Sequence, residues 1–347
     1  MEDVCYIRAA TEYYKVSEKP TINGHKEQNL IRWKLSTINQ DHSTSYKNRI
    51  PQYDDFCCLP SHLDFQQDVD GYFNLYSPLP HKPCDEPVID FDIPATLSFI
   101  RHIFGEQVEL GLDYLQLLYE DPVQKLPILC LVSSERETGK TTFLRWLSEL
   151  FGKNMTFIRS EGLSSQFNAD WLDKLLIGID EALINEKVML ERLKNLATAT
   201  REKLEQKGKD RRETDFFGKF VLCSNNEESF VQMDRNENRF WVRKIPVIPE
   251  EIYSSTFFEE LKSEIPQFLR YLLNRELSTK KRCRLWFDRH QIATSALEKV
   301  VENTTDKLEI QLIQTLYAVF EFTGTDSIVV PPSFRPSATN YNLFIII

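Results

Sequence analysis

The segment LPILCLVSSERETGKTTFLRWLSELFG, residues 126–152, contains the signals that decide the fold of this chain. Residues 126–132 form a continuous apolar run, which is typical of a strand buried on both faces of a sheet. The residues after the loop show helical periodicity, and Gly152 is a suitable stop for that helix. The apolar positions of the helical face are Leu144, Leu147, Leu150 and Phe151. The segment therefore predicts a strand, a polar loop and an amphipathic helix in succession.

The polar loop, SSERETGK at residues 133–140, resembles a phosphate loop of the pattern G-x-x-x-x-G-K-[ST], with Ser134 in place of the first glycine. The backbone N–H groups of such a loop and the following helix N-terminus favour bound phosphate. We expect Lys140 to reach the β- and γ-phosphates of ATP, and Thr141 to give its hydroxyl to Mg²⁺. The residues expected to line the nucleotide are Ser134, Thr138, Gly139, Lys140, Thr141, Thr142 and Asp180.

A second buried strand is expected at residues 175–179 (LLIGI), and it ends in Asp180-Glu181. A carboxylate at the end of a strand near a phosphate loop can hold Mg²⁺, so Asp180 is predicted to do so through water. Glu181 is predicted to polarise the attacking water as a general base. The alternative is that the pair caps the N-terminus of the next helix.

A third strand, residues 220–223 (FVLC), leads into Ser224-Asn225-Asn226. Asn225 is the first choice for a residue that senses the γ-phosphate and orients water, as in ring ATPases of the AAA+ type, and Asn226 is the second. Downstream, Arg239 is predicted to be an arginine finger, which stabilises charge on the transferring phosphoryl group and often comes from a neighbouring subunit. Two alternatives stay open: Arg235 has that role, or Arg239 is a surface residue paired with Glu237.

The segment TREKLEQKGKDRRETDFFGKF, residues 200–220, reads as a β-hairpin with a cationic tip around Gly208. It holds seven basic and five acidic residues, a local charge of +2 in a chain of net charge −10. Such a tip could grip a nucleic-acid backbone in a ring channel, because repeated subunits multiply a weak contact. The alternative is a solvated charged turn. The residues expected to contact DNA are Lys207, Lys209 and Arg211.

The order of these parts resembles superfamily 3 helicases, the hexameric replicative helicases of small DNA viruses, phages and plasmids. The most specific features are QKGKDRR at residues 206–212 and the SNN strand end at 224–226. The stretch CRLWFDRHQIATSAL at residues 283–297 looks closer to primase-helicase proteins of phages and mobile elements. The resemblance covers about residues 55–310. It implies an AAA+ core, a homo-hexameric ring, ATP-driven movement on single-stranded DNA and a role in DNA replication.

The expected fold is α/β, with a three-layer P-loop AAA+ core around a parallel sheet, an irregular N-terminal segment and a helical C-terminal region. The expected regions are an N-terminal accessory or connector region (1–92), a lead-in of two short helices (93–122), the helicase core (123–250) and a mainly helical C-terminal region (251–347). The apolar end YNLFIII indicates a truncated chain that lacks a winged domain.

The net charge of −10 argues against a general nucleic-acid coat protein, so DNA must be bound through a local basic patch. Seven cysteines without a CxxC pair, and no signal peptide or membrane-spanning run, indicate free thiols in the cytoplasm.

The predicted function is an ATP-dependent DNA helicase of a phage or mobile element, with single-stranded DNA and a primase as partners. The alternatives are an AAA+ ATPase that loads or remodels a nucleoprotein complex without unwinding, and a non-catalytic DNA-binding or assembly remnant.

Overall fold

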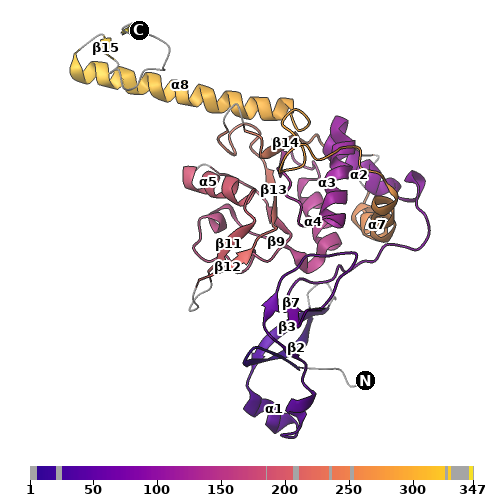
Figure 1. Cartoon of the computed structure of the whole chain (residues 1–347). Helices are drawn as coiled ribbons and strands as arrows, with labels where there is room; N and C mark the ends of the chain where they lie inside the picture. Colours follow the sequence, from indigo (N-terminus) through magenta and orange to yellow (C-terminus); the bar gives the residue numbers. More distant parts are fainter. Residues whose placement is uncertain are drawn as a thin grey trace.

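A computed structural model describes residues 6–20, 26–184, 186–205, 211–233, 237–250, 254–324, 327–329 and 344–346. Its centre is a five-stranded sheet in the order β14-β8-β13-β10-β9. Three of these strands, β14, β13 and β9, are labelled near the middle of Figure 1. The strands are β8 (Ile128–Val132), β9 (Met155–Phe157), β10 (Leu176–Ile179), β13 (Lys219–Ser224) and β14 (Phe240–Lys244). Every pairing between them is parallel, so all five strands end at one edge. The predicted parallel α/β core is confirmed.

Successive side chains along a strand point to opposite faces of the sheet, so both faces are apolar and each is covered by another layer. In β8, Leu129 and Leu131 point into one buried cluster, whereas Ile128, Cys130 and Val132 point into another on the opposite face. Helices cover both faces, as Figure 1 shows. The first cluster includes side chains from α2 (Pro94–Phe104), α3 (Val108–Glu120), α4 (Lys140–Phe151), α6 (Phe257–Ser263) and α7 (Ile265–Asn274). The second includes α5 (Lys187–Leu196).

The predicted helices of the lead-in and of the phosphate-loop segment are confirmed, and local chemistry fixes their ends. Pro94 stands in the first turn of α2, where its missing N–H costs nothing. The carboxylate of Glu264 accepts hydrogen bonds from the N–H groups of Ala95 and Thr96 at 3.1 and 2.7 Å. Gly152 ends α4 with φ 53°, as its sequence position predicts.

The described N-terminal region contains more regular secondary structure than the sequence predicts. β1 (Tyr6–Ala9), β2 (Glu12–Pro20), β3 (Lys26–Trp33) and β4 (Gln52–Tyr53) form a four-stranded sheet in the order β3-β2-β1-β4. It packs on α1 (Leu35–Asp41) through Tyr6, Ile38 and Ile50. The expectation of an irregular segment is therefore wrong for these residues. Three short strands follow as a separate sheet: β5 (Phe56–Cys57), β6 (Asp68–Val69) and β7 (Tyr72–Asn74).

The region after residue 254 is mainly helical, as predicted, and contains the long helix α8 (Ser295–Thr323), which projects from the body (Figure 1). Thr294 caps α8 by accepting a hydrogen bond from Leu297 N–H, and its hydroxyl donates to the carbonyl of Val242 in β14 at 2.6 Å. None of the helices in the described ranges has both the length and the apolar character of a membrane span.

The remaining elements are short. They are η1 (Tyr46–Arg49), η2 (Asp90–Asp92), η3 (Gly105–Gln107), η4 (Gly152–Asn154), η5 (Ser160–Leu163), β11 (Arg201–Leu204), β12 (Arg212–Asp215), β15 (Ser327–Val329) and β16 (Phe344–Ile346).

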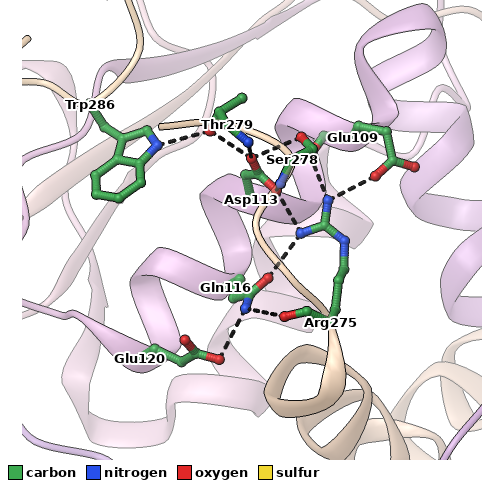
Figure 2. Close-up of polar contacts among 8 residues, drawn as sticks. All are labelled: Glu109, Asp113, Gln116, Glu120, Arg275, Ser278, Thr279 and Trp286. Carbon is green, nitrogen blue, oxygen red and sulfur yellow. Dashed lines mark hydrogen bonds and ion pairs between the residues drawn. The ribbon is translucent and has the colours of Figure 1, made fainter. Parts of the chain in front are cut away.

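A buried carboxylate ties the segment after α7 to helix α3. Asp113 is fully buried, and its oxygens accept hydrogen bonds from Arg275 Nη1 at 2.6 Å and from the N–H and hydroxyl groups of Ser278 and Thr279 (Figure 2). Trp286 Nε1 extends the network by donating to Thr279 Oγ1 at 2.9 Å. A buried charge is tolerated when it is paired and hydrogen-bonded, and this network provides both.

Candidate active site

The loop between β8 and α4 is held from two sides. Gly139 has φ 84°, and a Cβ there would lie 2.8 Å from Ile248 Cδ1 and 3.0 Å from Phe99 Cε2. His102 Nε2 donates to the carbonyl of Thr138 at 3.0 Å, and Ile248 N–H donates to the carbonyl of Glu137 at 3.0 Å. Both the conformation and the space at position 139 therefore require glycine. The loop has the turn that a phosphate-binding loop needs before a helix N-terminus.

Lys140 is a buried cation beside this loop. Its Nζ donates to Thr138 Oγ1 at 3.0 Å and to the carbonyl of Ser133 at 3.2 Å. Within the described ranges, no carboxylate lies at ion-pair distance from this ammonium. Burial lowers the pKa of Lys140, although the nearby groups Cys223, Asp180 and Glu227 oppose that effect. A buried ammonium held only by neutral oxygens favours an arriving anion.

Asp180 lies at the carboxyl edge of the sheet together with Thr141. Thr141 Oγ1 donates to Asp180 Oδ2 at 3.0 Å, across a separation of 39 positions in the chain. Asp180 follows β10, which is separated from β8 by β13, so the acidic residue lies two strands away from the phosphate-loop strand. Both side chains are exposed. Thr142 follows on the first turn of α4 and is half-buried.

The donor set of this edge fits a magnesium ion that is shared with phosphate. A hydroxyl and a carboxylate are the hard oxygen ligands that Mg²⁺ prefers, and Mg²⁺ usually completes its shell with waters and substrate phosphates. The described part of the chain has no group of three or more His, Cys, Asp and Glu side chains placed to hold a metal. A Thr141–Asp180 pair therefore suits a metal that arrives with a nucleotide.

Glu181 has a backbone conformation that is rare for its residue type. Its φ is 54°, its N–H donates to Asp180 Oδ1 at 3.1 Å, and its side chain is exposed. The next helix, α5, begins only at Lys187 with Glu186 as its N-cap residue, so the Asp180-Glu181 pair does not cap it. Glu137 in the phosphate loop also has a positive φ, 57°. Left-handed non-glycine residues are costly and cluster at functional sites, which draws attention to both positions.

The two candidate asparagines differ in how their side chains are used. Asn226 Oδ1 accepts from the N–H groups of Glu228 and Ser229 at 3.1 and 2.8 Å, and its Nδ2 donates to Ser229 Oγ at 2.7 Å. The side chain of Asn226 therefore stabilises the turn that follows it. Asn225 is exposed at the end of β13, directly beside β8, and its side chain has no hydrogen bond to the described residues. Asn225 is the asparagine whose side chain is available to a ligand.

Arg239 lies at the opposite edge of the sheet from the phosphate loop. It precedes β14, whose first residue pairs with Ile128 and whose last, Lys244, pairs with Val132. A strand of this length separates the two edges by roughly 16 Å at about 3.3 Å per residue. Arg239 Nη1 donates to Glu237 at 2.9 and 3.1 Å, so the alternative pairing noted from the sequence is present. Arg239 therefore does not reach its own phosphate loop, and Arg235 lies outside the described residues.

The predicted hairpin is present as the antiparallel pair β11–β12, with Arg201 opposite Asp215 and Leu204 opposite Arg212. The end of β11 nearest the tip is anchored by the buried Asn168, which donates to the carbonyl of Lys203 and accepts from the N–H of Glu205. Lys207 and Lys209 lie outside the described residues. Arg211 is described, and its Nε pairs with Glu205 at 3.0 Å.

The structure adds two residues that the sequence did not single out. Glu227 Oε1 accepts hydrogen bonds from the N–H and the hydroxyl of Ser134, and Glu227 Oε2 pairs with Lys244 at 2.8 Å. Both lie at the same sheet edge as Lys140. No local motif marks them, because Glu227 meets Ser134 across 93 positions of the chain.

Comparisons with known proteins agree with this architecture. Residues 131–243 match a family of unknown function (DUF5906). The chain is 22% identical over 256 residues to a DNA primase-polymerase of Nitratiruptor phage NrS-1. That alignment covers 71% of this chain but only 34% of the relative, so the chain spans about a third of the relative's length.

The apo structure of the NrS-1 C-terminal region (305–718) superposes with a TM-score of 0.65 at 19% identity, covering 86% of this chain and 71% of that one. A second apo form of the same region gives a TM-score of 0.63 at 20% identity. The chain therefore shares the fold of that region. JCV helicase gives a TM-score of 0.33, which does not establish a shared fold.

Proposed function

We propose that this chain is a Mg²⁺-dependent ATPase of the superfamily 3 helicase type, which hydrolyses ATP to move on single-stranded DNA during replication of a phage or mobile element. The observation on which the proposal rests most directly is the contact between Thr141 and Asp180 at 3.0 Å, beside the buried Lys140. The sequence relationship to a phage DNA primase-polymerase supports the replication setting.

Each residue of the edge has a role in the proposed reaction. Lys140 would exchange its neutral oxygen partners for the β- and γ-phosphates, with the loop N–H groups beside it. Thr141 and Asp180 would hold Mg²⁺, which when bound neutralises charge on the phosphates. Glu181 would accept a proton from the attacking water, and Asn225 would orient that water.

The arginine finger has to act between subunits. Because Arg239 lies at the far edge of its own sheet, we assign it to the nucleotide of a neighbouring subunit in a homo-hexameric ring. Glu237, itself paired with Lys194 at 3.2 Å, would hold the guanidinium ready for that contact. The hairpin β11–β12 would present Lys207 and Lys209 to the DNA backbone.

The test is ATP hydrolysis with and without single-stranded DNA, run beside unwinding of a forked duplex. We expect Mg²⁺-dependent turnover that DNA stimulates, strand separation, and loss of both activities in Lys140→Ala. Turnover without strand separation would favour a loader or remodelling ATPase. No binding of Mg²⁺-ATP at all would refute the enzyme proposal.

A further inference from the structure

The unusual serine of the phosphate loop has a partner. Ser134 occupies the position of the first glycine in the pattern, and its N–H and hydroxyl donate to Glu227 Oε1 at 2.8 and 2.9 Å. A glycine could make only the first of these bonds. Glu227 belongs to the loop after β13 that begins with Asn225, so the start of the phosphate loop is joined to the loop of the proposed γ-phosphate sensor.

The second oxygen of Glu227 joins a third element. Lys244 Nζ lies 2.8 Å from Glu227 Oε2, and Lys244 is the last residue of β14, paired with Val132 in β8. Although partial burial opposes it, hydrogen bonds from Lys244 and Ser134 lower the pKa of Glu227 to about 2. The carboxylate is therefore ionised at neutral pH. Because Lys244 balances its charge, Glu227 adds little net negative charge beside bound phosphate.

The loop that presents Glu227 is itself fixed. Asn226 N–H donates to Ser224 Oγ at 3.2 Å, and the side-chain oxygen of Asn226 accepts from the N–H groups of Glu228 and Ser229. Ser224 Oγ in turn donates to the carbonyl of Ala182, just after the Asp180-Glu181 pair. These hydrogen bonds fix the backbone of the loop on both sides of Glu227, and so they fix the place from which its carboxylate reaches Ser134.

We propose that Glu227 is a positioning residue for the phosphate loop, holding Ser134 against the sensor loop and the end of β14 through Lys244. This inference rests on the proposed function, because it assigns Glu227 to the site that binds ATP. A loop fixed before ATP arrives loses less conformational freedom on binding, which raises affinity without any contact to the nucleotide. Breaking the bridge leaves Lys140 and Thr141 intact but frees the loop that surrounds the phosphates.

The first measurement is the Kd of Mg²⁺-ATP by isothermal titration calorimetry. Glu227→Ala is expected to weaken binding about 10-fold, which corresponds to the loss of charge-assisted hydrogen bonds. Glu227→Gln can still accept from Ser134 but loses attraction to Lys244, so about a 3-fold loss is expected. Glu228→Gln, the exposed neighbour in the same loop, is the matched control and should leave Kd unchanged.

The second measurement is a double-mutant cycle with Ser134→Gly, which restores the pattern residue and removes only the hydroxyl bond. It is expected to weaken ATP binding about 2-fold in the native background and to have no further effect in Glu227→Ala. Such coupling separates positioning from general loss of stability, which thermal denaturation of each variant records. The kcat should change less than the KM for ATP, because Glu227 does not touch the reacting atoms.

Three outcomes would overturn the inference. Equal ATP affinity of Glu227→Ala and the native chain would show that the bridge is irrelevant to binding. Tighter ATP binding by Glu227→Ala would show that the Glu227 carboxylate opposes ATP binding. Additive effects in the cycle would show that Ser134 and Glu227 act separately. In each case the native chain still binds ATP through Lys140, so the proposed function stands; absence of ATP binding by the native chain would overturn both proposals.

Discussion

The hydroxyl of Thr141 and the carboxylate of Asp180 meet at 3.0 Å, joining the first turn of α4 to the end of β10 across the intervening strand β13. The two oxygens are therefore close together before any metal binds. A site whose ligands are already placed spends less free energy on ordering them, so small changes to either side chain should be visible in the magnesium requirement.

Replacing Thr141 by Val keeps the shape of the side chain and removes the oxygen. We expect the kcat/KM for ATP to fall about 100-fold, comparable to the loss of an important electrostatic contact, and Thr141→Ser to retain most of the activity. Asp180→Asn should raise the Mg²⁺ concentration that gives half-maximal turnover. Hydrolysis measured over a Mg²⁺ titration checks both, and an unchanged titration in Thr141→Val would rule out the hydroxyl as a metal ligand.

Arg239 and Lys140 should complement each other between subunits. Each of Arg239→Ala and Lys140→Ala is expected to be inactive alone, whereas a mixture should regain part of the activity. In mixed rings some interfaces combine an intact Lys140 with an intact Arg239 from the neighbour. Hydrolysis measured at a series of mixing ratios checks this. A mixture as inactive as its components would argue that Arg239 acts within its own subunit or not at all.

Two buried lysines should make stability depend on pH. Lys125 Nζ donates to the carbonyl of Phe216 and Lys219 Nζ to that of Pro122. Burial lowers the pKa of Lys125 from 10.5 to about 8, and lowers that of Lys219 strongly. Between about pH 8 and 10.5 the Lys125 side chain holds more protons in the unfolded chain than in the folded chain, so its contribution to the free energy of unfolding should rise with pH. Burial raises the pKa of the thiols of Cys58, Cys130 and Cys223, whose contribution falls with pH, so the lysine contribution is read from the difference between the native chain and a Lys125 variant.

Lys125→Met should flatten that rise and increase stability at pH 7 by about 2 kcal/mol, the cost of the buried charge less one lost hydrogen bond. Lys125→Arg keeps the charge through this range, so it should flatten the rise and lower stability instead. Urea denaturation at pH 7 to 10 compares the three chains. A difference in stability between the native chain and Lys125→Met that stays constant from pH 7 to 10 would contradict the assignment.

The network around Asp113 should be a major source of stability for the C-terminal region (Figure 2). Asp113→Ala leaves Arg275, whose side chain is 10% exposed, without its buried partner. We expect a loss of about 3–5 kcal/mol, as for other broken buried pairs. Glu109→Gln removes only the exposed partner of Arg275 and should cost less than about 1 kcal/mol. Equal melting temperatures for the two variants would contradict this ranking.

The hairpin tip should determine the salt dependence of DNA binding. Lys207→Ala combined with Lys209→Ala is expected to reduce the slope of log affinity against log salt by about 1.4 for each hairpin in contact, since each phosphate contact on a single strand contributes about 0.7. Fluorescence anisotropy with labelled single-stranded DNA measures the slope. Arg201→Ala, which removes a side chain already paired with Glu213 and Asp215, is the control and should change it little.

The sequence predicts the central architecture well because its signals are local. The helices over residues 94–120 and 140–151 follow from apolar periodicity, and Gly152 marks an end that the structure confirms. β9 is missed because it has only three residues, of which Met155 is buried and Phe157 exposed. The N-terminal sheet is missed because β2 is partly exposed along most of its length, so its side chains show no clear alternation.

The site is predicted less completely than the fold. A motif places Lys140 and Thr141, and a strand end places Asp180, so their proximity could be expected. The choice between Asn225 and Asn226 depends on which of the two side chains is already hydrogen-bonded to the backbone of the turn, and this is visible only in three dimensions. Contacts such as Ser134–Glu227 depend on the order of strands in the sheet, which no spacing along the chain encodes.

The enclosure of Gly139 has a consequence for any shortened version of the protein. Phe99 and His102 in α2 hold the phosphate loop, and Trp241 Nε1 donates to Gln107 just beyond that helix. A recombinant fragment starting at residue 123 would keep every motif of the active edge and still lose these supports. A fragment designed to test nucleotide binding by this loop should therefore begin before Pro94, because a shorter one would lack the side chains that hold the loop.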